Sequence, residues 1–461
     1  MLATAVQQGT FPGLAAGVVV GDRLMWSGGW GHADLDTRRG VSAATRFRIA
    51  SITKTFVGVG LLMAHERGAF AWDDPACLHV PEIAKVVYPT RDSPRITIRH
   101  LVTHTAGLPR VEALDYASEG GRALDEPGLL ALLDGMRLES APGTGVRYSN
   151  LGAALAAVVL GRVSGAPPTE VLRREVVVPL GMTGTEWRPG AASVSALAAG
   201  YRQKADGSFV RGRPWPLRVE APVVGLYSNV TDMARYAAFH LQAWPPDDVV
   251  MRAGVTAAAL RSSHVAFGPA IPGGQAHGVF WMIDGDPTLG HVVRHSGSTA
   301  LYSATLWLLP RRDLAVVLLA NTGNVASQRL DELAREVLLA LLDADPDPSP
   351  EVSRPVAAAI RTVKSLLLEP SVDTIRRRFS RRFLQSVPAE ELVRFFERHR
   401  RVLGACREHH VLRADADDSA VVRLYCAEGE MRVTVHVRRS SPHEVAGLIL
   451  EAFPQSDGDL P

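Results

Sequence analysis

Lysine is scarce in this chain of 461 residues, which carries 4 lysines against 46 arginines. Arginine stays protonated at any accessible pH, whereas a desolvated lysine can lose its proton. A lysine retained against this bias is therefore a candidate for chemistry that arginine cannot perform. One of the four, Lys54, follows Ser51 by three residues in the stretch "RIASITKTF".

Cysteine is rarer still, with only Cys77, Cys406 and Cys426 in the chain. Because the three lie far apart and are odd in number, we predict neither a disulfide framework nor a CxxC metal site. The N-terminal "MLATAVQQGTFPG" lacks the basic segment and apolar run of a secretory signal, and the apolar "GLAAGVVV" after it is too short to cross a bilayer. These absences favour a reducing compartment and a cytoplasmic location.

Net charge is nearly absent too, at +2, while hydrophobic residues make up 46% and charged residues 21% of the chain. Such values are ordinary for a globular protein with a sizeable core. The balanced charge gives no reason to expect a nucleic acid or a membrane as partner. The motifs G-x-S-x-G, G-x-G-x-x-G after a strand, and H-E-x-x-H are absent, so we expect no cofactor and no metal.

The pattern of apolar residues predicts an α+β fold for the first three quarters of the chain. Two strands flank a turn at Gly21 and Asp22, and a helix from Ser51 to Arg67, stopped by Gly68, has no polar face and should be buried. Strands return from 292 and are followed by an amphipathic helix at about 326–343. We therefore expect one antiparallel sheet, built from both ends of this region and flanked by helices, with a mostly helical insertion.

The acidic, proline-rich "DADPDPSPEVSRP" separates this region from the rest of the chain. We predict a first domain over 1–343, a linker over 344–355 and a small α+β domain over 356–461, in which helices precede antiparallel strands. This order is similar to that of NTF2-like domains. Dimerisation, substrate gating and lid formation stay open as its role.

Ser51 and Lys54 share one face of the start of the predicted helix. A serine there lies in the positive end of the helix dipole, close to free backbone N–H groups, which suits a nucleophile whose attack creates an oxyanion. Serine needs a neighbour to accept its proton. That neighbour is either a neutral Lys54 or a phenol whose pKa the Lys54 ammonium lowers. As an isolated motif, Ser-x-x-Lys also arises by chance.

Two further segments offer partners. In "PGTGVRYSNLGAALAAVVLG", Tyr148 could accept a proton and Asn150 could orient substrate or lysine, although a buried tyrosine before a helix cap is the plainer alternative. In "RHSGSTALYSATLWLLP", His295, Ser296 and Gly297 would lie on an edge strand beside a cleft, where glycine permits close approach. The backbone N–H of Ser298 could then join that of Ser51 in an oxyanion hole.

Taken together and in this order, these segments resemble the serine β-lactamase and penicillin-binding-protein superfamily, and most of all its class C β-lactamase-related branch with family VIII carboxylesterases and D-stereospecific peptidases. The resemblance spans nearly all of residues 10–340. Supporting stretches are "FRIASITKTF", "ITIRHLVTHTAGLP", "YSNLGAALAAVVLGRVSG", "PLGMTGTEW", "VVGLYSNVTDMARY" and "RHSGSTALYSATLWLLPRRDLAVVLLANTG".

The resemblance implies that Ser51 is the acylated nucleophile and that Lys54 and Tyr148 share the general-base work. It also implies that Asn150 contacts Lys54 and the substrate amide. His295 takes the place of the lysine in the family's Lys-Thr-Gly, with substrate bound along Ser296, Gly297 and Ser298. Since histidine is only partly protonated at neutral pH, a permanent charge for a substrate carboxylate is lost. An esterase or a D-amino-acid-type peptidase is thus favoured over an efficient β-lactamase.

Two other functions stay open on the sequence. The acyl-enzyme could be resolved by an amine rather than water, which would make the protein an acyltransferase or cyclase, or the fold could survive as a catalytically silent scaffold. The expected partner is a small-molecule or peptide-like ester or amide, and a homodimer is possible. His104 in "THTAGLP" is predicted to stabilise its loop rather than to act in catalysis.

Overall fold

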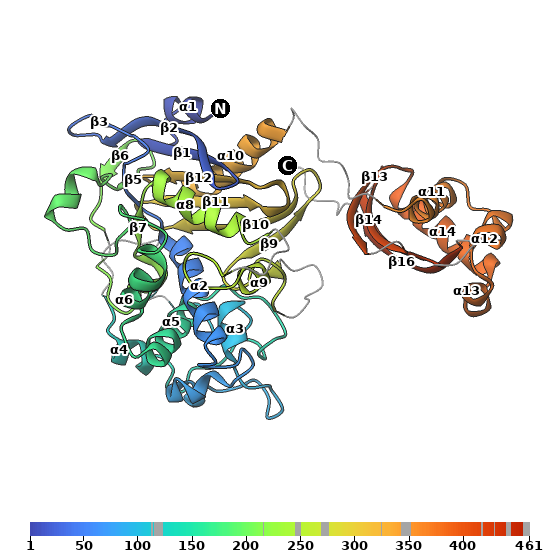
Figure 1. The fold of residues 1–461 in the computed structure, drawn as a ribbon, viewed down its shortest axis with the longest axis horizontal. Coiled ribbons are helices and arrows are strands. Elements are labelled where there is room, and N and C mark those ends of the chain that lie inside the picture. The colour runs from blue at the N-terminus through green and yellow to red at the C-terminus, as the bar shows by residue number, and fades with distance from the viewer. Residues whose placement is uncertain are drawn as a thin grey trace. The chain divides into compact units, whose positions relative to one another are not determined.

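The chain forms two compact units, Met1–Ala344 and Asp345–Pro461 (Figure 1). The structure is a computed structural model. The structure describes residues 1–111, 114, 123–214, 216–244, 250–268, 276–323, 325–342, 352–415, 418–427, 429–438 and 444–454.

In its described part, unit 1 is built on an eight-stranded sheet with the order β3-β2-β1-β12-β11-β10-β9-β8. Strand β1 pairs antiparallel with β12, so the two ends of the unit meet in the middle of the sheet as predicted. The strands are β1 (Gly13–Val20), β2 (Arg23–Asp34), β3 (Arg39–Gly40), β8 (Ala276–His277), β9 (Met282–Asp286), β10 (Gly290–Ser298), β11 (Ser303–Leu309) and β12 (Leu314–Ala320).

Helices cover both faces of this sheet (Figure 1). Along β12, alternate residues such as Val317 join the main core, against α8 (Val230–Leu241). The residues between them, such as Val316, join a second core against α10 (Val325–Leu342). Since successive side chains of a strand point to opposite faces, a strand buried on both sides must be apolar throughout. This explains the unbroken "LAVVLLA" of β12.

The helix that follows Ser51 runs through the middle of the helical region. Every residue of α2 (Thr53–Glu66) from Thr53 to Ala64 is buried, as its sequence predicted, and α2 packs against α5 (Asn150–Ser164). In the described part of the chain, no single helix is long and apolar enough to cross a membrane. Among the described residues, the only helices that together have enough length and apolar character are α5 and the helical segment 168–177, and the chain bends sharply between them.

Short elements complete unit 1. Sequence patterns missed β8 and β9, because "MIDGD" in β9 carries neither alternation nor β-branched runs. The remaining elements are α1 (Leu2–Gln7), β4 (Phe47–Arg48), η1 (Ala50–Ile52), η2 (Ala76–Leu78), η3 (Pro81–Lys85), α3 (Ile98–Val102), α4 (Glu126–Ala131), α6 (Pro168–Leu172), η5 (Arg173–Val177), η6 (Ala191–Ala196), β5 (Tyr201–Gln203), β6 (Phe209–Arg211), α7 (Ala221–Val224), β7 (Tyr227–Ser228), α9 (Ala257–Ser262) and η7 (Pro310–Arg312).

Unit 2 places helices before a four-stranded antiparallel sheet, in the order that the sequence predicted. Unit 2 has a separate hydrophobic core, in which Ile360 and Phe396 of the helices are buried against Val433 of the sheet. The elements are α11 (Arg354–Leu368), α12 (Val372–Arg378), α13 (Arg381–Ser386), α14 (Ala389–Leu403), β13 (Cys406–Asp415), β14 (Ser419–Cys426), β15 (Gly429–Val437) and β16 (Val445–Pro454).

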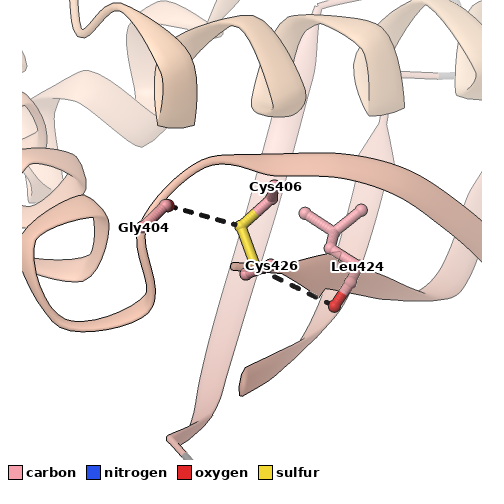
Figure 2. The surroundings of a disulfide bond; sticks show 4 residues. All are labelled: Gly404, Cys406, Leu424 and Cys426. Carbon is pink, nitrogen blue, oxygen red and sulfur yellow. Dashed lines mark hydrogen bonds between the residues drawn. A yellow bond between two sulfur atoms is a disulfide. The ribbon is translucent and has the colours of Figure 1, made fainter. Parts of the chain in front are cut away.

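A disulfide joins Cys406 to Cys426 in unit 2, so the expectation that no disulfide forms was wrong (Figure 2). The register of β13 and β14 places the two cysteines directly opposite each other. Strand register depends on the three-dimensional fold, so the separation of 20 residues between the two cysteines does not predict that they pair. A cross-link closing a loop of this length stabilises a domain by about 3 kcal/mol in the chain-entropy view. Cys77 is free and half-buried.

Candidate active site

The turn before α2 presents Ser51 next to a buried amine. The Lys54 Nζ donates a hydrogen bond to Ser51 Oγ at 2.8 Å and another to the Val223 carbonyl at 3.3 Å. Ala50, directly before the serine, has a left-handed backbone with φ of 47°. Such a conformation is uncommon for a residue with a Cβ, and strained backbone of this kind clusters at functional sites.

Burial changes the chemistry of the amine. Lys54 is 0% exposed, and burial lowers its pKa from 10.5 to about 7, with no described carboxylate opposing the shift. Desolvation disfavours the charged form, so near neutral pH a large fraction of Lys54 is the free amine. That amine can accept the proton of the Ser51 hydroxyl to which it is hydrogen-bonded.

Tyr148 brings the third predicted group to the same place. Its side chain is hydrogen-bonded to that of Ser51, and Lys54 Nζ lies 5.2 Å from the centre of its ring. Although 38% of the residue is exposed, desolvation around the hydroxyl raises its pKa, and the bond to Ser51 opposes this only in part. The phenol therefore stays protonated. These opposite shifts make Lys54 the better proton acceptor and Tyr148 a proton donor.

The edge of β10 lies against the nucleophile. Strand β9 pairs with Gly290–Arg294, and β11 with 293–298, so of the described strands only β11 pairs with His295–Ser298. The sequence predicted an edge strand here, but β10 is an interior strand of the sheet, with β9 and β8 beyond it. A Cβ added to Gly297 would lie 2.9 Å from the backbone N of Ser51 and would overlap the carbonyl of Ile49. Only glycine lets the two segments approach this closely.

His295 faces the same side as Gly297. Its ring centre lies 6.3 Å from that of Tyr148, and the residue is 2% exposed. Burial, aided by the nearby Lys54, lowers the pKa of His295 to about 3. The imidazole is thus neutral at physiological pH, which corrects the expectation of partial protonation.

The side chain of Ser296 points the other way, and its part in binding substrate stays a prediction. Its Oγ donates to both carboxylate oxygens of Asp331 on α10, at 2.6 and 2.8 Å. Asp331 also accepts the Nε1–H of Trp307 at 3.1 Å. Ser296 therefore anchors β10 to the helix behind the sheet. The side chain of Ser298 donates to the carbonyl of Thr299 at 3.4 Å, and the oxyanion role of its backbone N–H stays a prediction.

Asn150 does not contact Lys54, contrary to expectation. Its Nδ2 donates to the Leu114 carbonyl at 2.9 Å, and its Oδ1 is buried with no hydrogen-bond partner among the described residues. The second acceptor of Lys54 is Val223 instead. The cap of α5 is Ser149, which accepts the backbone N–H of Gly152 at 3.0 Å.

Comparison with known proteins identifies the wider group. The profile of the family described as Beta-lactamase matches residues 1–340. The chain belongs to the beta-lactamase family. It is 25% identical over 330 residues to Protein flp of Staphylococcus aureus (strain MRSA252), covering 71% of this chain and 63% of that protein. It thus spans less than two thirds of the first curated relatives. A Beta-lactamase of Escherichia coli (strain K12) is 25% identical over 361 residues, covering 73% of this chain and 90% of that protein.

The structural comparison supports the same fold. The octameric penicillin-binding protein homologue from Pyrococcus abyssi has a TM-score of 0.63 and 19% identity, covering 99% of this chain and 93% of that one. At this identity the likeness shows the fold alone. The predicted β-lactamase/transpeptidase-like α+β fold is confirmed.

Two buried histidines that no motif singled out for this role complete the surroundings of the beta-lactamase-family site. The ring centre of His104 lies 4.4 Å from that of Tyr148, and the ring centre of His277 lies 5.5 Å from that of His104. Burial lowers the pKa of both imidazoles. The described residues contain no group of three or more His, Cys, Asp or Glu side chains placed to hold a metal ion.

Proposed function

We propose that the chain is a serine hydrolase that forms an acyl-enzyme on Ser51 and cleaves an uncharged ester or amide, as an esterase or D-amino-acid-type peptidase of the class C-related branch. One observation carries this proposal. A lysine amine with a pKa of about 7 lies 2.8 Å from Ser51 Oγ. A nucleophile hydrogen-bonded to a base of matched pKa is the arrangement that covalent catalysis requires.

The proton path follows from the pKa shifts. Lys54 accepts the Ser51 proton as Oγ bonds to the carbonyl carbon, and the oxyanion binds between the backbone N–H groups of Ser51 and Ser298. Tyr148 gives its proton to the departing alcohol or amine as the scissile bond breaks, and regains one from Lys54. Water then attacks the acyl-Ser51 ester and gives a proton to Lys54. When the intermediate collapses, the C–Oγ bond breaks, Lys54 returns that proton to Ser51 Oγ, and the acid is released.

The neutral His295 bears on substrate choice. A cation in its place would bind a substrate carboxylate through a charge-assisted hydrogen bond. A buried imidazole with a pKa of about 3 supplies no such charge. Carboxylate-bearing β-lactams therefore gain no charge-assisted hydrogen bond at this position, and uncharged esters lose nothing by its absence.

The proposal is tested with a fluorophosphonate probe and a substrate panel. Intact-mass and peptide mass spectrometry should find one adduct, on Ser51, and p-nitrophenyl butyrate should be turned over faster than nitrocefin. Ser51→Ala should lose the adduct and the turnover, while the exposed-loop control Ser93→Ala keeps both. A folded wild-type protein that gives no adduct on Ser51 would be a silent scaffold, and the proposal would be wrong.

Substituting His295 with lysine should shift preference toward carboxylate-bearing substrates. We expect His295→Lys to raise the rate of nitrocefin acylation relative to p-nitrophenyl butyrate by about tenfold, the worth of one charge-assisted hydrogen bond. The measurement is kcat/KM for both substrates. His295→Gln, which is neutral, serves as the control and should leave the ratio near that of the wild type. An unchanged ratio in His295→Lys would show that this position does not contact the substrate carboxylate.

A further inference from the structure

The motif "THTAGLP" places a histidine in a costly position. His104 follows α3 with a left-handed backbone, φ of 57°, and its side chain is 2% exposed. Left-handed backbone is uncommon for residues other than glycine, although asparagine, aspartate and histidine adopt it more often than most. A histidine with this backbone, whose ring is fully buried, indicates that the ring has a function.

His104 holds the residues on either side of Tyr148. Its carbonyl accepts the backbone N–H of Arg147 at 2.7 Å, and its Nδ1 accepts the backbone N–H of Ser149 at 3.2 Å. The segment that carries the phenol is thus bound on both flanks by one residue. The bond to Ser149 is buried, where an unpaired N–H is expensive.

The imidazole also contacts Tyr148 itself. The two ring centres are 4.4 Å apart with an angle of 33° between the planes, within the range of favourable aromatic pairs. Because Nδ1 accepts a backbone N–H, the neutral ring carries its proton on Nε2. Protonation of Nδ1 would replace that hydrogen bond by a repulsion between two donors. One neutral tautomer therefore makes all three contacts at once.

We propose that His104 is the positioning residue for Tyr148: its carbonyl, its Nδ1 and its ring face together hold the phenol over Ser51. The inference rests on the proposed hydrolase function. His104 has no described hydrogen bond to Ser51 or Lys54, so it acts through Tyr148 and is not itself catalytic. Displacing a catalytic group by about 1 Å is enough to lower a rate by about 10²-fold.

A double-mutant cycle separates positioning from general stability. His104→Ala should lower kcat for p-nitrophenyl butyrate by about 10- to 100-fold with little change in KM, because the phenol is misplaced. In a Tyr148→Phe background, the same substitution should cause less than a twofold further loss, since the group that it positions is gone. His65→Ala, which removes a partly buried histidine packed against Phe70, is the control and should leave kcat unchanged.

Two milder variants keep the test decisive where His104→Ala fails to fold. His104→Asn retains an acceptor and tolerates a left-handed backbone, and His104→Phe retains the ring. Both should lose less activity than Tyr148→Phe, with little further loss when combined with it. Multiplicative losses, or a wild-type kcat in these variants, would overturn the inference. Full activity in Ser51→Ala would instead overturn the hydrolase proposal, so the two failures are distinguishable.

Discussion

Lys54→Arg should lower kcat/KM for an uncharged ester by about 10²- to 10⁴-fold, the usual worth of a general base. The substitution keeps a long cationic side chain and removes only the ability to lose a proton. In the wild type, burial lowers the pKa of Lys54 to about 7, so the fraction of free amine rises as pH increases through 7. We therefore expect kcat/KM of the wild type to rise over about pH 6 to 8.

The pH profile is what identifies Lys54 as the base. The residual rate of Lys54→Arg should not show the rise near pH 7, because guanidinium does not titrate there. Lys54→Met, which is neutral and of similar size, should be equally slow. The exposed Lys85 offers a matched control, and Lys85→Arg should match the wild type in rate and profile. A rise near pH 7 that persists in Lys54→Arg would assign it to another group.

The same physical cause has opposite consequences at two positions of the site. Burial lowers the pKa of Lys54 and of His295 alike. For an amine, which starts at 10.5, the shift ends near neutrality and creates a usable base. For an imidazole, which starts at 6.5, it ends near 3 and removes the charge altogether. The proposed hydrolase would therefore combine a usable base at Lys54 with an uncharged side chain at His295.

Features that depend on local pattern could be predicted from the sequence. The buried helix after Ser51 and the pairing of the N-terminal and C-terminal strands of unit 1 followed from apolar periodicity. The meeting of Ser51 with Lys54 followed from helical spacing, and that of Tyr148 with both from the family resemblance. The alternation of β10 would also have placed Ser296 on the face opposite His295, a consequence of strand geometry that the resemblance obscured.

Features that depend on which neighbour a side chain meets could not be predicted. The Nδ2 of Asn150 donates to the Leu114 carbonyl while its Oδ1 accepts no hydrogen bond from Lys54, and nothing in either local sequence indicates this arrangement. The partnership of Cys406 with Cys426 depends on the register of two strands. His104 lies 44 residues before Tyr148, and its part in the site emerges only when the loop folds over the start of α5.

Gly297→Ala should lower kcat by about 10²- to 10³-fold, comparable to the loss of one oxyanion-hole donor. The added Cβ would overlap the Ile49 carbonyl and lie 2.9 Å from the Ser51 nitrogen. Backbone atoms on both sides cannot move aside cheaply, so β10 must withdraw from Ser51 and carry the N–H of Ser298 with it. The pair of donors would then be too far apart to hold one oxyanion.

Gly40→Ala provides the matched control, because nothing lies within 4 Å of a Cβ at that strand position. It should retain the wild-type kcat, and thermal melting of both variants would show whether unit 1 stays folded. The acylation rate, measured by stopped-flow release of p-nitrophenol, should fall in Gly297→Ala while Lys54 keeps its pH dependence, since the base is untouched. A folded Gly297→Ala protein with wild-type acylation would mean that the oxyanion is stabilised somewhere other than between Ser51 and Ser298.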